Sequence, residues 1–369
     1  MKKAAFYILL SAMGLTSYSQ TDADRNKLIQ QLDKMDTSKQ VKPEAQLKYN
    51  EGVAAYEAKK YSESIAKFTE AIQIDPRFEK AYFNRANVYS GQKEYDKAIA
   101  DFNSIILLND TSSKAHFMLA STYQEKGDLA AAIIAFDKAI TKRNDDPRLY
   151  YNKGTVYFQQ QEYQKAIDEF NLAIRFKPNY AYAYNDRGSA KRMLNDLDGA
   201  EKDYNKAVEC NPKLTFAYNN LGSVLRMKKK YQEAIAEFNN AIRLKKEYHL
   251  AYNNRGLTKL EAGNYEEAIK DFDACISYDK TYMMAYLNRA AAYIKLEKWK
   301  EAIKDLDKCI ELDPNSGAAY LNRGIAKEMT RDLLGACNDW GMAASLSIES
   351  GETYYNGPAC DEVKKYLEK

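Results

Sequence analysis

The sequence contains few residues of the kinds that build active sites and metal centres. It has 2 histidines and 5 cysteines in 369 residues. None of them has the spacing of a zinc site, and the sequence has no glycine-rich phosphate loop and no nucleophile motif. We therefore expect no catalytic residue, no metal site and no cofactor, and we predict that the protein is not an enzyme. Carboxylates such as Asp271 and Asp305 recur at regular intervals, and we interpret them as solvated helix faces.

A strong excess of charge of either sign and a long apolar run are also missing. The formal net charge is +3 at pH 7, and it falls to +1 if Lys2 and Lys3 are removed with an N-terminal signal. A nearly neutral chain argues against nucleic acid as a partner. The longest early apolar run, from Ala4 to Leu15, is shorter than the roughly 20 residues that span a bilayer. We therefore expect no integral membrane segment after signal removal.

The first 19 residues have the pattern of a signal peptide. Two lysines precede an apolar run, and small and polar residues follow it at 17–19. The protein is thus predicted to be exported, to the periplasm or outside the cell, or to a peripheral position at the outer membrane. An uncleaved anchor or a disordered start is the alternative. Residues 20–44 are polar and are either a linker or a leading helix, with a short helix from Asp22 to Met35 and a break at Pro43.

Residues 45–350 consist of one pattern that occurs nine times with a period of 34 residues and no insertion. In the seventh repeat, Tyr252 and Gly256 have helical spacing before a Gly-Asn turn, and Ala268 and Phe272 have helical spacing after it. Each repeat is therefore predicted to be two amphipathic helices that pack on each other. The eighth position is small throughout: Gly52, Ala86, Ala120, Gly154, Gly188, Gly222, Gly256, Ala290 and Gly324.

This pattern of small residue, Ala and aromatic resembles that of tetratricopeptide repeat proteins, and Pro76, Pro178, Pro212 and Pro314 match the late proline of that family. The resemblance covers residues 45–350. It implies an all-α fold, a right-handed superhelical α-solenoid of nine helix pairs. It also implies a protein or peptide partner.

In such proteins, the second, sixth, ninth and thirteenth positions of each repeat line a concave groove in which extended peptides lie. The sixth position reads Asn84, Met118, Asn152, Asp186, Asn220, Asn254, Asn288 and Asn322 from the second repeat to the ninth. A side-chain amide both donates and accepts, so it can pair with any peptide backbone. The series resembles the asparagine ladder of O-linked N-acetylglucosamine transferases, whose catalytic part has no counterpart here. Alternatively, each amide bonds only to the neighbouring helix.

The predicted groove changes in character along the chain. Its second position is basic in the second to fourth repeats and apolar in the next four, which favours acidic and then apolar ligand groups. These residues are Lys80, Lys114 and Arg148, then Tyr182, Phe216, Leu250 and Met284. Arg192 and Arg226, each followed by a methionine, add cationic and soft apolar contacts near the middle. Burial of Tyr182 and Phe216 between repeats is the alternative.

The last segment, 351–369, is predicted to form a capping helix from about Pro358. In an oxidising compartment, a disulfide between Cys337 and Cys360 would hold it, and two free thiols are the alternative. Cys275 and Cys309 take a slot that is usually Ala, and His116 takes one that is usually Tyr, so all three are predicted to be core residues.

The function predicted from these features is a non-catalytic protein-interaction scaffold of the cell envelope, which holds an extended segment of a partner in the groove. The alternative is a structural component that assembles through its convex face or its solenoid ends.

Overall fold

The computed structural model describes residues 40–367, and this part of the chain is helical throughout. It contains 20 helices, α3 to α22, and no strand within the described range. The predicted all-α fold of paired helices is therefore confirmed. Each of these helices is too short or too polar to span a bilayer. The predicted signal peptide and the predicted helix from Asp22 to Met35 lie outside the described residues.

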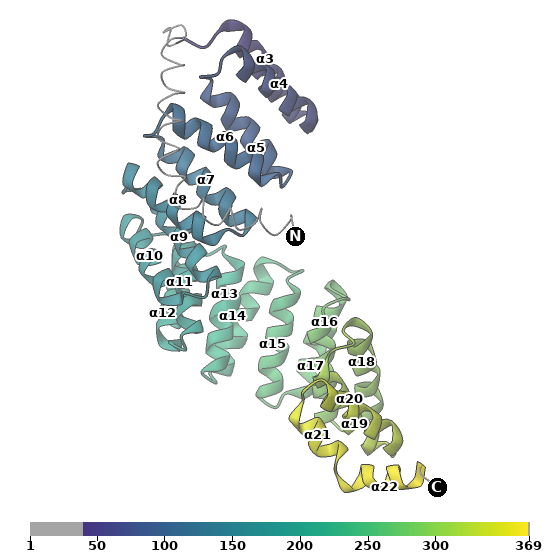
Figure 1. The fold of residues 1–369 in the computed structure, drawn as a ribbon. Helices are drawn as coiled ribbons and strands as arrows, with labels where there is room; N and C mark the ends of the chain where they lie inside the picture. Colours follow the sequence, from purple (N-terminus) through teal and green to yellow (C-terminus); the bar gives the residue numbers. More distant parts are fainter. Residues whose placement is uncertain (1–39, 368–369) are drawn as a thin grey trace. The chain divides into compact units, whose positions relative to one another are not determined.

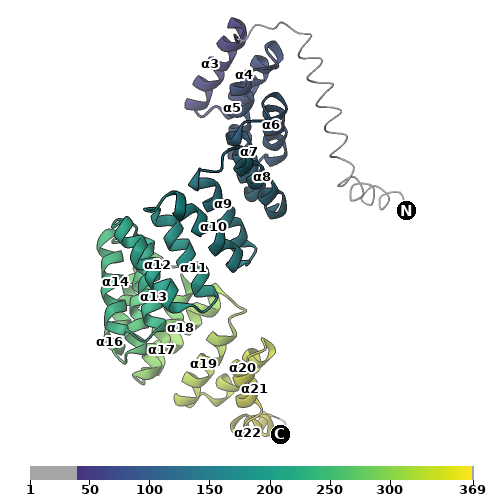
Figure 2. The ribbon, with the colours of Figure 1, turned by 90° about the vertical axis from the view of Figure 1, so that its left-hand side faces the viewer.

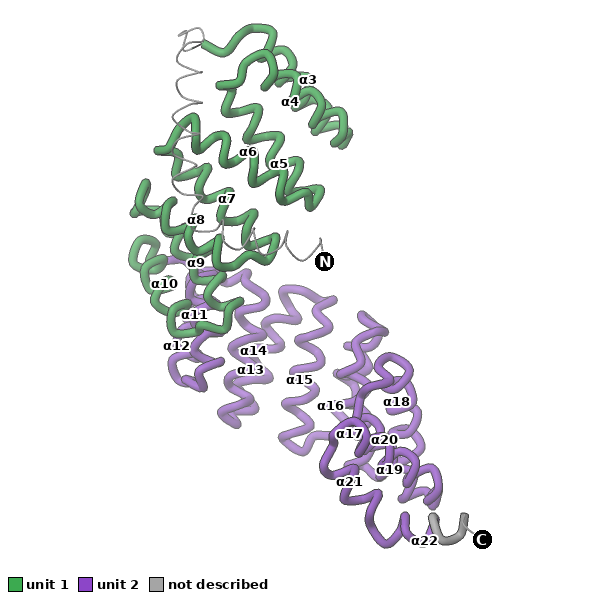
Figure 3. Tube along the Cα trace, viewed as in Figure 1, with its two compact units in different colours: residues 1–178 green, residues 179–369 purple. Residues whose placement is uncertain are grey.

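The chain forms two compact units, an N-terminal unit up to Pro178 and a C-terminal unit from Asn179 (Figure 3). In the N-terminal unit the helix pairs are α3 (Pro43–Glu57) with α4 (Tyr61–Ile74), α5 (Glu79–Gly91) with α6 (Tyr95–Leu108), α7 (Ser113–Lys126) with α8 (Leu129–Lys142), and α9 (Pro147–Gln159) with α10 (Tyr163–Phe176). Within the unit, each second helix also packs on the first helix of the next repeat (Figure 1).

The C-terminal unit continues the same arrangement of helix pairs (Figure 2). Its pairs are α11 (Ala181–Met193) with α12 (Leu197–Cys210), α13 (Thr215–Met227) with α14 (Tyr231–Leu244), α15 (His249–Glu261) with α16 (Tyr265–Tyr278), α17 (Met283–Lys295) with α18 (Trp299–Leu312), and α19 (Gly317–Met329) with α20 (Leu333–Ser345). Two short helices, α21 (Glu349–Tyr355) and α22 (Pro358–Leu367), then pack on α20.

The predicted helix from about Pro358 is present as α22, and the structure adds a further short helix, α21, before it. Helix α21 packs on α20 as each first helix packs on the preceding second helix, but it has only 7 residues. Its Tyr354 ring stacks on Trp340, with the centroids 4.9 Å apart. Helix α21 therefore takes the place of the first helix of a tenth repeat. The chain then turns at Gly357, and α22 follows.

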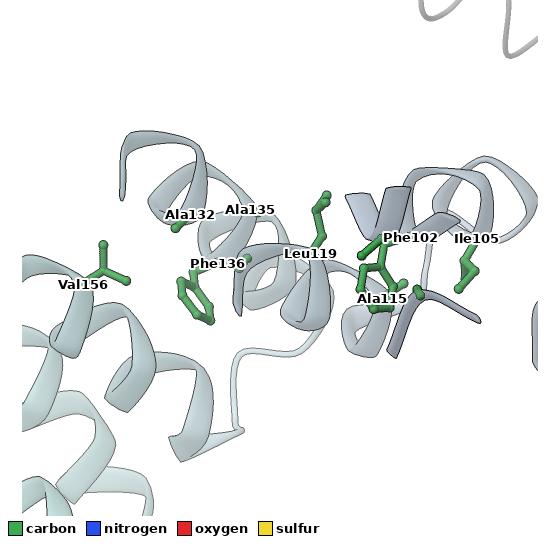
Figure 4. Packing of buried hydrophobic residues seen from close by; sticks show 11 residues of the cluster. Phe102, Ile105, Ala115, Leu119, Ala132, Ala135, Phe136 and Val156 are labelled. Carbon is green, nitrogen blue, oxygen red and sulfur yellow. The ribbon is translucent and has the colours of Figure 1, made fainter. Parts of the chain in front are cut away.

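Small residues and aromatic rings make the core of each pair. A Cβ added at Gly154 would lie 2.7 Å from the ring of Phe170, and one added at Gly256 would lie 2.7 Å from the ring of Phe272. Such contacts are too short, so these glycines allow the two helix backbones to approach around the ring. Figure 4 shows the corresponding packing in the N-terminal unit, where Phe102 and Phe136 are fully buried among alanines.

A tight turn with one left-handed residue joins the two helices of each pair. Gly127 and Gly263 have φ values of 89° and 85° at this position. The other turns use non-glycine residues there, such as Lys229 at 59° and Glu297 at 56°. The residue that follows is the N-cap of the second helix, as Asn264 is after Gly263, so the same short turn joins the helices of every pair.

Candidate functional site

The C-terminal unit contains the apolar part of the groove that the sequence predicts. We define its groove face as the second and sixth positions of α11, α13, α15 and α17. Three apolar side chains on this face are well exposed: Tyr182 at 46%, Phe216 at 36% and Met284 at 42%, whereas Leu250 is half-buried. The rings of Tyr182 and Phe216 touch, with centroids 5.9 Å apart. These two rings therefore contact each other while keeping part of their surface in solvent.

Three asparagines of the groove face already form hydrogen bonds within the chain. Each of three sixth-position amides donates an Nδ2 hydrogen to the Oδ1 of the fifth-position asparagine of the preceding repeat. The pairs are Asn220 to Asn185, Asn254 to Asn219 and Asn288 to Asn253, each at 3.0 Å. The acceptors are buried, at 3 to 8% exposure. The alternative from the sequence, in which each amide bonds to a neighbouring helix, is therefore correct for one of the two N–H groups of these three amides.

These contacts fix the orientation of the amides. With one N–H committed, a second N–H and the Oδ1 atom remain on each half-buried side chain. Within the described chain, no hydrogen bond reaches the Oδ1 atoms of Asn220 and Asn288, whereas Asn254 Oδ1 accepts a longer one of 3.4 Å from Asn253. Asp186 continues the series and accepts from Asn185 at 2.8 Å. The ladder can still bond to another chain, through fewer atoms than the sequence predicts.

The remaining predicted groove residues are in different situations. Asn84 donates to the hydroxyl of Tyr49 at 2.9 Å, and Asn152 donates to the carbonyl of Arg148 in its own helix at 2.7 Å. Asn322 is half-buried on α19. The guanidinium of Arg226 forms an ion pair with Glu261 of the next repeat, which neutralises its charge.

The environments of the two arginines differ. Arg192 keeps its Nε buried without a hydrogen-bond partner. Met193 and Met227, which follow the two arginines, are 51% and 43% exposed. The predicted soft apolar contacts are therefore available at the surface.

In the N-terminal unit, the basic part of the predicted groove surrounds a cavity. The cavity has a volume of about 360 Å³ and is lined by Lys80, Lys114 and Asn84, with Tyr49 and Phe83 at its apolar wall, among others. The ammonium of Lys114 lies 4.1 Å from the centre of the Phe83 ring.

Arg148, the third basic residue predicted here, is held by Asp146 through hydrogen bonds of 2.6 to 3.2 Å. Its charge is therefore compensated within the chain. The charged residues that line the cavity are therefore Lys80 and Lys114 together with the acidic Glu79, which leaves one net positive charge.

A repeated buried ion pair was missed in the sequence. In five repeats an arginine on the first helix forms two parallel hydrogen bonds with an aspartate on the second. The pairs are Arg85–Asp101, Arg187–Asp203, Arg255–Asp271, Arg289–Asp305 and Arg323–Asp339. Our interpretation of Asp271 and Asp305 as solvated was wrong, because they are 3% and 4% exposed.

The arginine of this pair also joins neighbouring repeats. Arg323 donates to Asp339 of its own repeat and to Asp307 of the preceding one. The hydrogen bonds that Arg323 donates to Asp339 raise the pKa of Arg323. Arg85, Arg255 and Arg289 likewise bond to a residue of the preceding repeat, so these arginines each link three helices. The sequence held a usable signal, since arginine at the seventh position coincides with aspartate sixteen residues later.

The third repeat has lost this pair, and a cavity of about 190 Å³ lies in its place. Leu119 and Ala135 occupy the two positions, and both line the cavity together with His116. His116 is 4% exposed, as the sequence predicted for a core residue, and neither ring nitrogen has a hydrogen-bond partner. Burial lowers the pKa of this histidine.

The cysteines fall into two groups. Cys275 and Cys309 are fully buried, and burial raises the pKa of each thiol to about 12. Such thiols are poor nucleophiles at neutral pH. The structure places a disulfide between Cys337 on α20 and Cys360 on α22, with the Cα atoms 5.6 Å apart. No cluster of three His, Cys, Asp or Glu in the described residues has the geometry of a metal site.

Comparison with known families identifies the repeats. Models described as tetratricopeptide repeat match residues 79–112, 117–181, 181–214, 203–236, 249–282 and 284–316, and one described as TPR repeat matches residues 52–93. Together these matches cover most of the chain. No curated protein matches it.

Solved structures with TM-scores above 0.5 share the fold. A tetratricopeptide repeat protein from Parabacteroides merdae is 22% identical, with a TM-score of 0.55 over 66% of this chain and 97% of that one. The Cut9 and Hcn1 assembly of the APC/C is 13% identical, with a TM-score of 0.54 over 87% of this chain and 77% of that one. YrrB, reported as a TPR protein with an unusual peptide-binding site, is 24% identical, with a TM-score of 0.42 over 50% of this chain and 95% of that one.

Proposed function

Because this chain belongs to the tetratricopeptide repeat family, we propose that it is a non-catalytic scaffold that binds an extended segment of a partner protein along the groove face. The observation that carries the proposal is the row of exposed apolar side chains beside oriented amides in the C-terminal unit. Apolar residues exposed in a row are expected at binding surfaces. Here Tyr182, Phe216 and Met284 are spaced one or two repeats apart.

The amides supply the polar part of such a surface. Asn220 and Asn288 each offer an Oδ1 acceptor that can receive a backbone N–H of the bound segment, whatever its sequence. Because their side chains are already fixed by the fifth-position asparagines, little rotamer entropy is lost on binding. The resemblance to the asparagine ladder of O-linked N-acetylglucosamine transferases supports this role.

The charge of the N-terminal unit supports a preference within that unit. Lys80 and Lys114 line its cavity beside Asn84, while Arg148 is compensated by Asp146. Glu79 lines the same cavity, so two lysines face one carboxylate, and the part of the ligand bound there is expected to carry a single negative charge.

We propose an envelope location for this binding. The signal pattern of residues 1–19 and the cysteine pair at the C-terminal end both suit export to an oxidising compartment. The partner is then an exported protein or a component of an envelope complex.

A peptide selection tests the binding proposal. The protein lacking residues 1–19 is used to select from a library of random peptides, and the affinity of the selected peptides is measured. We expect Phe216→Ser with Met284→Ser to weaken binding at least tenfold, because the apolar contacts are lost. Leu244→Ser is the matched control, since Leu244 is 38% exposed at the end of α14, away from the groove face.

Two outcomes oppose the proposal. Equal loss of affinity in the Leu244 control and the groove variant would contradict binding at the groove face. Failure to select any peptide, together with a mass that rises with concentration in light scattering, would instead favour a structural component that assembles through its convex face or its ends.

A further inference from the structure

Three side chains that form a stack in most repeats are all smaller in the third repeat. In five repeats, the arginine of the buried ion pair lies over the ring of the tyrosine three residues before it, with 5.3 to 5.7 Å between the guanidinium carbon and the ring centre. Tyrosine, arginine and aspartate therefore fill one continuous space. The third repeat has His116, Leu119 and Ala135 at these positions. The fourth and sixth repeats keep the tyrosine and an acidic residue.

The cavity of about 190 Å³ in the third repeat lies where this side-chain volume is missing. Its lining comes from α6, α7 and α8, all within the N-terminal unit. Figure 4 shows two residues of its wall, Leu119 on α7 and Ala135 on α8. Three other lining residues are exposed, Ile134 at 57% together with Asn103 and Lys138. The cavity is therefore open to solvent beside these three side chains.

The cavity contains a buried polar group without a partner, the imidazole of His116. This side chain is 4% exposed, and neither ring nitrogen has a hydrogen bond. At the same position, the longer side chains of Tyr150 and Tyr286 donate to the carbonyl oxygen six residues earlier, at 2.8 and 3.2 Å. Because burial lowers the pKa of His116, the imidazole is neutral at neutral pH, with one nitrogen as donor and the other as acceptor. A ligand hydroxyl would supply the missing hydrogen bond.

The walls of the cavity limit the size and the charge of a ligand. A protein cavity of about 150 Å³ with apolar walls holds benzene, so one of about 190 Å³ accommodates an aromatic ring with small substituents. None of the lining residues is acidic, so a cationic group such as the guanidinium found here in other repeats would lack a counter-ion. Water beside His116 would face the apolar side chains of Leu119 and Ala135, although a bound water usually has about two to four polar partners.

We propose that this cavity is a binding site for an uncharged phenol, whose ring packs against Leu119 and Ala135 and whose hydroxyl forms a hydrogen bond with a ring nitrogen of His116. A free phenol and the side chain of a tyrosine in a partner present the same ring and hydroxyl, so both are sources of this ligand. None of the lining residues occupies the second or sixth position of its repeat. The proposal therefore does not depend on the groove.

Ligand-observed NMR titrations of the whole chain with p-cresol and toluene test this site. The wild type should bind p-cresol roughly fivefold more tightly than toluene, because only p-cresol carries the hydroxyl. His116→Phe should bind the two compounds with equal affinity. Ala135→Leu fills the cavity and should weaken the binding of both by at least tenfold, while its melting temperature without ligand should be no lower than that of the wild type. Ala318→Leu, at an exposed position of α19, is the control and should bind as the wild type does.

Three results would overturn the proposal: no saturable binding of p-cresol, unchanged binding in Ala135→Leu, or equal affinity of the wild type for p-cresol and toluene. If Ala135→Leu does not fold, Leu119→Phe fills the same space and replaces it in the test. N-acetyltyrosinamide separates the two sources of the phenol. Binding of this compound that Ala135→Leu abolishes would assign the site to a tyrosine side chain, and binding of p-cresol alone would assign it to a free phenol.

Discussion

Replacing Arg289 by leucine tests whether the buried ion pair holds the repeats together. Asp305 is 4% exposed, and its two carboxylate oxygens each accept a 2.7 Å hydrogen bond from Arg289. Arg289→Leu leaves that carboxylate buried and without a cation. Breaking one side of a buried pair in this way costs roughly 3 to 5 kcal/mol. Arg289 also bonds to Asp273, whose side chain is 52% exposed and can be solvated instead.

The double variant Arg289→Leu with Asp305→Ala copies the third repeat, where Leu119 and Ala135 occupy these positions. It removes both charges together but leaves a space like the cavity of the third repeat, so we expect the free energy of unfolding to fall by about 1 to 2 kcal/mol relative to the wild type. The double variant should therefore be more stable than the single variant by about 2 kcal/mol or more.

Guanidinium unfolding, combined with hydrogen exchange of α17 and α18, measures the difference. Exchange is needed because a repeat array can unfold in parts. Asp273→Ala is the control and should cost less than about 0.5 kcal/mol, as an exposed ion-pair partner does. If the single and double variants are equally unstable, the unpaired carboxylate of Asp305 is not the cause of the loss. The loss would then come from the packing volume of Arg289 alone.

Three further predictions concern other parts of the chain. Burial depresses the pKa of His116 below 6.5, so the folded state resists protonation of this histidine. The free energy of unfolding should therefore fall as the pH drops below 6.5, by about 1.4 kcal/mol for each unit by which the pKa is depressed. His116→Tyr should remove this dependence on pH in unfolding titrations. At the left-handed turn position, Gly263→Lys should cost about 1 kcal/mol, while the reverse change Lys229→Gly should be neutral or slightly stabilising, which thermal unfolding would show. Reduction should increase the intact mass by two hydrogens, and Cys360→Ser should destabilise α20 to α22 by about 3 kcal/mol in hydrogen exchange without affecting α13; an unchanged mass would mean two free thiols.

Much of the fold followed from the period of the sequence. The regular return of a small residue and an aromatic ring predicted both helices of each pair, and Gly256 against Phe272 is the contact that this pattern describes. The packing thiols and the buried His116 followed from the same argument, because each replaces a known core residue. The final helix, α22, was predicted from about Pro358, whereas α21 was not, because it begins a repeat that the chain does not complete.

The candidate site was less predictable because its residues have two possible partners. The sequence cannot distinguish an asparagine whose amide is free to bind a ligand from one whose amide bonds within the chain. Asn220 and Asn254 each donate one N–H to the preceding repeat. The same holds for Arg226, which pairs with Glu261 about one repeat further along the chain. The period places these residues on a face, but the stacking of repeats determines which polar atoms are already used.

The sequence by itself determined the helix pairs, their number and the positions that face the core, since apolar side chains at helical spacing must be buried to stabilise the chain. Only the tertiary structure decided the state of the polar residues. Asp305 is buried and paired although a carboxylate is usually solvated, and Leu47 is exposed although Leu149 at the same position is covered. Burial depends on which helix lies alongside, and the pattern within one repeat does not contain that information.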